Sequence, residues 1–190
     1  MKHILLITIV SFFASITFAQ EAHLKFKGIP INGNYKVFAQ QLIQKGFRQL
    51  EASQDAIVLS GNFMAIPDVM VLVYPDPASK VVSSVSAFVE AGNKWATIEN
   101  KYEDIVDTYK EKYGNPSQHI EEFTTDIHND DFFRKNALEN GQCNYKSIWE
   151  IEGGRIVITL VYFQFKYYVL CGYVDEQNEK ALRQTIIDDI

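Results

Sequence analysis

The chain has few of the residues from which recognisable active sites are built. Its 190 residues include only two cysteines, four histidines and five prolines. None of the motifs Gly-x-Ser-x-Gly, His-Glu-x-x-His, Gly-x-Gly-x-x-Gly or the P-loop occurs, and the cysteines and histidines lack the spacing of a zinc site. These absences exclude the usual signatures of hydrolases, metalloproteases and nucleotide-binding enzymes. We therefore predict a protein that is not an enzyme and uses no cofactor.

Positive charge is scarce as well. There are 18 lysines and arginines against 24 aspartates and glutamates, a formal net charge of −6. A mildly acidic chain without a basic stripe is poorly suited to nucleic acid or to an anionic membrane surface. No apolar run after the first twenty residues is long enough to cross a bilayer. We expect no nucleic-acid partner and no membrane insertion, and composition leaves the oligomeric state open.

The single long apolar run lies at the N-terminus. It follows the basic start Met1-Lys2-His3, covers residues 4–18, and ends in Thr17-Phe18-Ala19, which puts small residues three and one before a cleavage point. This pattern predicts a signal peptide over residues 1–19 and a periplasmic or extracellular protein. A buried N-terminal strand or a retained anchor is the alternative.

The two cysteines lie in the second half of the chain. An exported protein meets an oxidising compartment, where a disulfide is permitted. Cys143 precedes a predicted strand and Cys171 lies in the last one, so neighbouring strands would bring them together. A disulfide between Cys143 and Cys171 is one prediction. Two separate thiols, with Cys171 as a small core residue, is the other.

The first half of the chain predicts a helix followed by a sheet. Tyr35, Phe38 and Leu42 fall at helical spacing, with Val37 widening the stripe, and Lys45-Gly46 ends the helix. Strand patterns follow at 47–52, 56–64, 69–74 and 80–90, with a turn expected at Pro67-Asp68. Four successive strands after one helix indicate an antiparallel meander with the helix on one face.

The second half has a similar order. Apolar and aromatic residues at three- and four-residue steps predict a helix over 95–113, which ends at Gly114. Strands are expected at 118–123, 145–151 and 155–163, then up to Val174, with a hairpin turn at Gly153-Gly154. A short helix is expected within 126–141. A last helix is expected over about 176–187, with Ala181, Leu182, Thr185 and Ile186 facing inward.

These patterns predict an α+β fold of two tandem units, each a helix packed on an antiparallel sheet of about four strands. Residues 71–74 and 159–162 share one pattern, and both helices end in a Lys and Gly pattern. The first unit covers 20–92. The second covers 93–190, with an insertion at about 124–143 and the C-terminal helix. Chance similarity between strands is the alternative.

Aromatic residues are the strongest indication of function, since they make up 13% of the chain. A sheet with helices on one face should be apolar on that face only, yet here residues of both parities are aromatic. Some rings should therefore lie exposed on the sheet, where tyrosine and tryptophan commonly recognise other proteins. The candidate binding residues are Tyr145, Trp149, Tyr162, Tyr167 and Tyr173. Packing between the two units, or under the insertion, is the alternative.

One acidic segment is a weaker candidate site. Asp126, His128, Asp130 and Asp131 offer hard ligands for calcium, but the sixth position of an EF-hand loop needs glycine and holds Asp131 here. Aspartates that cap a helix explain the same residues. We assign no catalytic residue and no metal ligand.

The first residues of the mature chain carry a resemblance. Residues 26–31, Phe-Lys-Gly-Ile-Pro-Ile, and the helix ending at Lys45-Gly46-Phe47 are similar to the N-terminal pattern of small exported bacterial proteins of unknown function. The duplicated plan resembles the beta-lactamase inhibitor protein family. That resemblance implies a curved antiparallel sheet whose concave, aromatic-rich face binds a partner enzyme. No inhibitory motif is matched, so it implies no binding residue.

The function that we expect is an exported, non-enzymatic binding module that recognises another protein or a cell-envelope component through its aromatic sheet face. One alternative is a binder of a small ligand or carbohydrate, with the same rings as stacking platforms. Another is a metal-dependent enzyme of unrecognised type that uses the acidic segment.

Overall fold

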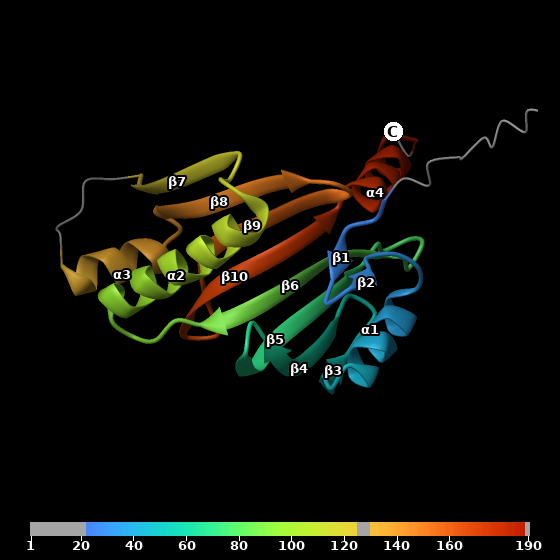
Figure 1. Cartoon of the computed structure of the whole chain (residues 1–190), viewed down its shortest axis with the longest axis horizontal. Helices are drawn as coiled ribbons and strands as arrows, with labels where there is room; N and C mark the ends of the chain where they lie inside the picture. Colours follow the sequence, from blue (N-terminus) through green and yellow to red (C-terminus); the bar gives the residue numbers. More distant parts are fainter. Residues whose placement is uncertain (1–21, 125–129, 189–190) are drawn as a thin grey trace, which may run out of the picture.

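The protein has an α+β fold in which helices pack on a large antiparallel sheet (Figure 1). A computed structural model describes residues 22–124 and 130–188. Within these ranges there are four helices, an eight-stranded sheet and a separate two-stranded hairpin. The predicted signal peptide, residues 1–19, lies outside the described residues.

The first half of the chain forms the predicted helix and four strands, preceded by a small hairpin that was not predicted. Its elements are β1 (Lys25–Phe26), β2 (Ile29–Pro30), α1 (Tyr35–Gln44), β3 (Arg48–Ala52), β4 (Ile57–Phe63), β5 (Ile66–Pro75) and β6 (Val82–Glu90). Asn34 caps α1, because its side chain accepts a hydrogen bond from the Lys36 N–H at 3.0 Å. Val37, which was expected to widen the apolar stripe, is 57% exposed.

The turn predicted at Pro67-Asp68 is in the wrong place. The β4–β5 turn is formed by Met64 and Ala65, with φ of +52° and +60°, and Phe63 pairs with Ile66 across it. Pro67 lies inside β5, at an irregularity where the pairing jumps from Phe63 to Gly61 on β4. A bulge tolerates proline because no ladder hydrogen bond is needed there.

The second half also follows its predicted order. Its elements are α2 (Trp95–Tyr113), β7 (Gln118–Phe123), α3 (Asp131–Glu139), β8 (Cys143–Ile151), β9 (Gly154–Phe163), β10 (Lys166–Asp175) and α4 (Glu176–Asp188). The described part of the predicted insertion, which excludes residues 125–129, contains the short helix α3. The predicted hairpin is present, but its turn is formed by Glu152 and Gly153, one residue earlier than predicted, because Gly154 already pairs with Ile151.

The eight strands lie in the order β3-β4-β5-β6-β10-β9-β8-β7, and every neighbouring pair is antiparallel. Each run of four strands therefore forms a meander. The last strands of the two runs, β6 and β10, pair at the centre of the sheet, where Ala87 lies opposite Cys171. In chain order, a helix precedes each run of four strands.

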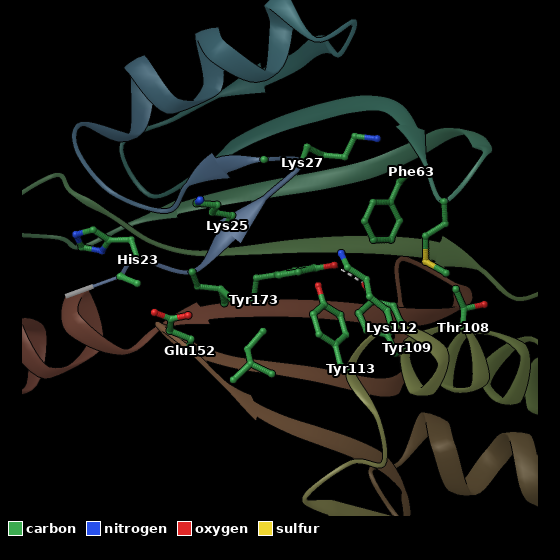
Figure 2. Close-up of a pocket in the computed structure, with 15 residues that line it drawn as sticks. His23, Lys25, Lys27, Phe63, Thr108, Tyr109, Lys112, Tyr113, Glu152 and Tyr173 are labelled. Atoms are coloured by element: carbon green, nitrogen blue, oxygen red, sulfur yellow. Dashed lines mark hydrogen bonds between the residues drawn. The ribbon is translucent and has the colours of Figure 1, made fainter. Parts of the chain in front are cut away.

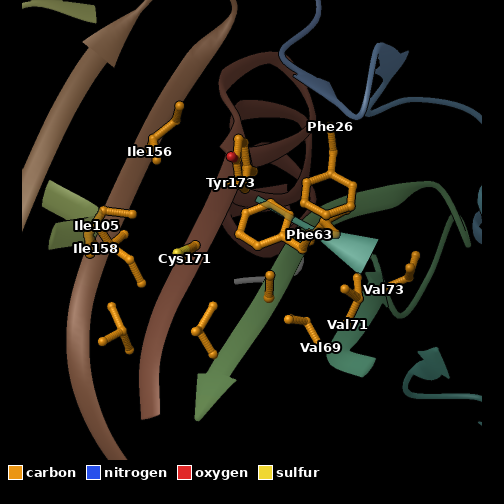
Figure 3. Close-up of a cluster of buried hydrophobic side chains, with 14 of the residues drawn as sticks. Phe26, Phe63, Val69, Val71, Val73, Ile105, Ile156, Ile158, Cys171 and Tyr173 are labelled. Carbon is orange, nitrogen blue, oxygen red and sulfur yellow. The ribbon is translucent and has the colours of Figure 1, made fainter. Parts of the chain in front are cut away.

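The core lies on one face of this sheet, under α1, α2 and α3 (Figure 1). Alternate residues of the strands, including Val71, Ile158 and Cys171, have no exposed surface and form one buried cluster (Figure 3). The β1–β2 hairpin completes this side, with the Phe26 ring stacked 5.7 Å from Phe63 and edge-on to Tyr173 at 5.1 Å.

The last helix packs differently from its prediction. Ala181, Thr185 and Ile186 were expected to face inward but are exposed, and only Leu182 is half-buried. The helix α4 leaves the end of β10 and touches the sheet chiefly near its start, where Asn178 donates hydrogen bonds to the carbonyls of Ile31 and Val82. A helix held mainly at one end leaves most of its apolar side chains in solvent.

Candidate functional site

Most of the aromatic residues predicted to form an exposed binding face lie in the core. Trp149 is 2% exposed, and its indole N–H donates to the Gly114 carbonyl at 2.8 Å. Tyr145 packs edge-on against Trp95 and Tyr102 of α2. The alternative interpretation, in which the rings are packed under other elements, therefore explains Trp149 and Tyr145.

The remaining three predicted residues also face the helices. Tyr167 is buried beside the half-buried Tyr162, and its hydroxyl donates to Glu139 of α3. Tyr173 is buried, and its hydroxyl shares a hydrogen bond with that of Tyr109 on α2. The alternation of residues along the strands did not reveal this packing. The aromatic residues of α2 pack between those of the sheet, and so rings that looked surplus to the core are buried in it.

The predicted disulfide is absent, since Cys143 and Cys171 are both free. Cys143 lies on β8 and Cys171 on β10, with β9 between them. Two strand spacings amount to roughly 10 Å, beyond the 7 Å that a disulfide spans between Cα atoms. The register adds a further offset along the strands, because Cys171 lies opposite Ile158, which lies opposite Ser147. Cys171 is the buried core residue of the alternative interpretation.

The acidic segment shows helix capping where it is described. The Asp130 carboxylate accepts from the Phe133 N–H at 3.0 Å and caps α3. Asp131 pairs with Lys135 at 2.8 Å, and the Lys135 ammonium helps hold the pKa of Asp131 below its usual value. Asp126 and His128 lie outside the described residues. Within residues 22–124 and 130–188, no group of three or more histidines, cysteines or acids is placed to hold a metal ion.

The face of the sheet away from α1, α2 and α3 has many apolar side chains, mixed with a few polar ones. Cross-strand rows run over it from β4 to β8, and most of their side chains are half-buried. One row contains Val58, Leu72, Ser86, Gly172, Val157 and Ile148, and the next contains Ser60, Met70, Phe88, Leu170, Thr159 and Lys146. We call the surface that these two rows form the open sheet face. The start of α4 borders one end of this side of the sheet, beside Arg155 and Val174.

Two exposed aromatic residues, Phe163 and Phe165, lie at the other end of that face, and two more, Phe132 and Phe133, lie on α3. Phe163 is 38% exposed and its ring is 5.7 Å from Phe88, which also packs edge-on against Tyr168. The β9–β10 turn follows, with Gln164 and Phe165 at φ of +48° and +63°. Phe165 is 90% exposed. Phenylalanine is unusual in a left-handed turn, and the Phe165 ring is not packed in the core, so neither the turn nor the packing explains this residue.

A cavity of about 590 Å³ opens on the helix-covered side, between the β1–β2 hairpin and the C-terminal end of α2 (Figure 2). Its wall contains Tyr109 and Tyr173, and its rim carries Lys25, Lys27 and Lys112. Among these residues, only Tyr173 was predicted from the sequence to be a binding residue. The lysines were missed because they are up to 87 positions apart, between Lys25 and Lys112, and only the folded chain brings them to one opening.

Comparisons with known proteins do not identify a family. No protein-family model matches the chain, and no significant match exists among curated proteins or among solved structures. The resemblance to the beta-lactamase inhibitor protein family therefore stays a prediction. In the part of the chain that the structure describes, no helix has both the length and the apolar character that a membrane span requires.

Proposed function

We propose that this chain is an exported, non-enzymatic binding protein that holds a partner protein on its open sheet face. One observation carries the proposal: the eight-stranded sheet has apolar side chains in the middle of both faces, and three of the four described helices cover only one of them. An antiparallel sheet with one solvated face normally carries polar residues on that face. Leu72, Leu170 and Val157 take those positions here.

The size and shape of the open sheet face favour a protein over a small molecule. Six strands about 4.8 Å apart and two rows about 7 Å deep each give the open sheet face an area of about 400 Å². That is about half of what one partner contributes to a standard protein interface. The exposed Phe165 beside it would supply an anchor residue of the kind that dominates binding energies.

We also propose that the fold consists of two tandem units, residues 20–92 and 93–190, on the plan of the beta-lactamase inhibitor protein family. The repeated order of one helix and four strands supports this proposal, as does the central pairing of β6 with β10. Export rests on the pattern of residues 1–19, and N-terminal sequencing of the secreted protein tests it, with Gln20 as the expected first residue.

Site-specific photo-crosslinking tests the proposed interface. A photoreactive amino acid is placed at Leu170, on the open sheet face, in cells that produce the protein. A matched control places it at Val37, an equally apolar but exposed residue of α1 on the opposite side. We expect one protein to crosslink at Leu170 and not at Val37. We also expect a Leu72→Lys exchange to reduce the yield at least tenfold while far-UV circular dichroism stays unchanged.

Two outcomes would contradict the proposal. Equal crosslinking at Leu170 and Val37 would mean that the face is not an interface. A crosslinked product that contains only this chain would mean that the face binds a second copy. The carbohydrate alternative is weaker, because four of the five rings that were expected to stack on a sugar are buried.

A further inference from the structure

The cavity beside α2 has the dimensions of a small-molecule site and a fixed wall. Its volume of about 590 Å³ lies in the range of ligand pockets. The strand-like segment before β1 is held on both sides, because the Leu24 N–H donates to Asp175 at 2.9 Å and the Ile31 N–H donates to the Leu24 carbonyl at 2.7 Å. A Cβ at Gly153 would lie 2.4 Å from the Ala22 carbonyl oxygen, so the β8–β9 turn closes tightly against this segment.

The interior of the cavity is aromatic. Phe63 and Tyr173 line one side, and Tyr109 and Tyr113, with rings 5.8 Å apart, line the other (Figure 2). The Tyr109 and Tyr173 hydroxyls share one hydrogen bond, and the Tyr109 hydroxyl also hydrogen-bonds to the Cys171 thiol. The flat rings suit a ligand with a planar body.

The rim of the cavity is positively charged, whereas the protein as a whole carries a net negative charge. Lys25, Lys27 and Lys112 are exposed around the opening, and Glu152 is the only carboxylate in the lining. No ion pair among the described residues involves any of the three lysines. The C-terminal end of α2 accounts for Lys112, because cations stabilise that end of a helix. It does not account for Lys25 and Lys27, which come from the facing hairpin.

Two residues that line the cavity have backbone conformations that side chains other than glycine rarely adopt. Lys27 and Met64 both have φ of +52°, at the tips of the β1–β2 and β4–β5 hairpins, where asparagine or glycine is usual. A side chain other than glycine is disfavoured in this region, because its Cβ comes close to the backbone. Both turns nevertheless present long side chains at the cavity, one cationic and one apolar.

We propose that this cavity binds a small organic anion with a planar apolar body, of the class of aromatic carboxylates. The rings would enclose the body of the ligand and the lysines would attract its acidic group. The site is separate from the open sheet face, because the cavity opens on the helix-covered side of the sheet.

Calorimetric titration of the purified protein with 2-naphthoate, 2-naphthamide and acetate tests this proposal. These probes are an aromatic anion, its neutral counterpart and an anion without a ring. We expect 2-naphthoate to bind at least tenfold more tightly than either of the others. The double variant Lys25→Gln/Lys27→Gln should weaken 2-naphthoate binding about tenfold and change 2-naphthamide binding less than twofold. Glutamine already occupies the same backbone region at Gln164, so the exchange at Lys27 preserves the turn.

The control variant is Lys94→Gln, an exposed lysine at the other end of α2, which should leave all three affinities unchanged. Equal affinity for 2-naphthoate and 2-naphthamide would overturn the proposal, as would the absence of 2-naphthoate binding at millimolar concentration. Loss of 2-naphthoate binding in Leu170→Lys, with retention in the double variant, would move the site to the open sheet face and also overturn it.

Discussion

Asp175 connects the two ends of the described chain, and its replacement tests how the fold is closed. This carboxylate has no exposed surface. One oxygen accepts from the Asn178 N–H at 3.0 Å and caps α4, and the other accepts from the Leu24 N–H at 2.9 Å. The ring of His23 also lies 3.0 Å from the second oxygen. One side chain therefore caps the last helix and fixes the segment that leads into β1.

The expected effect of Asp175→Ala is the sum of two losses. Losing a helix cap lowers the free energy of unfolding by about 1 kcal/mol. Leaving the buried Leu24 N–H without an acceptor lowers it by a further 1–3 kcal/mol or so. We therefore expect a total of about 2–4 kcal/mol, measured by urea denaturation followed by tryptophan fluorescence. Asp175→Asn keeps one acceptor oxygen and should lose about half as much.

The matched control is Asn34→Ala, which removes a helix cap and nothing else. The Asn34 side chain accepts from the Lys36 N–H in an exposed position, and the pairing of residue 34 with Val81 is made by the backbone, which alanine keeps. It should lower the free energy of unfolding by about 1 kcal/mol. If Asp175→Ala lowers it no more than Asn34→Ala does, the carboxylate does not hold the N-terminal segment, and the reasoning is refuted.

Three further predictions concern the core. Trp149→Ala should lower the free energy of unfolding by about 3–5 kcal/mol in the same denaturation assay, since it empties a packed site, and a loss below 1 kcal/mol would place the ring outside the core. Burial raises the pKa of the Cys143 and Cys171 thiols to about 12, so native protein at pH 8 should resist alkylation, whereas denatured protein should take up two alkyl groups by mass spectrometry without a reductant; no uptake would indicate a disulfide. Burial also raises the pKa of Tyr102 to about 12, so the folded state keeps a proton that the unfolded state loses near pH 10. Stability should therefore fall above pH 10, and Tyr102→Phe should reduce that slope by about 1.4 kcal/mol per pH unit; an unchanged slope would contradict the shift.

The order of helices and strands was predictable because the signals for it are local. The stripe of α2, from Trp95 to Tyr109, repeats every three or four residues, and Gly114 ends the helix at φ of +78°. The β8–β9 hairpin was also predictable from its glycines, although only Gly153, at φ of +85°, lies in the turn and Gly154 begins β9. The turn at Met64 and Ala65 was not predictable, since neither residue favours the left-handed region and the proline three positions later gives a stronger turn signal.

The binding surfaces were less predictable, because they depend on which face of each strand the helices cover. Trp149 and Ile148 are neighbours, and sequence parity alone does not say which of them lies under α2. Tyr145 and Trp149 were predicted to be exposed because aromatic residues often form binding surfaces. In the structure they are buried, because they pack against the rings of Tyr102 and Tyr109 on α2. The smaller apolar residues of the other parity, such as Leu170, were left on the open side.

The central strand β10 contributes to both proposed sites, and its geometry keeps them apart. Successive residues of a strand point to opposite faces, so Tyr173 lines the cavity while Gly172, one residue earlier, belongs to the open sheet face. β10 pairs with β9 along its whole length and with β6 over residues 168–174. Such a strand cannot shift by one residue without exchanging its two faces, so its register is fixed by the core. Neither a ligand at Tyr173 nor a partner at Leu170 should therefore be able to shift β10 by binding. We therefore expect the affinity of each site to be the same whether or not the other site is occupied.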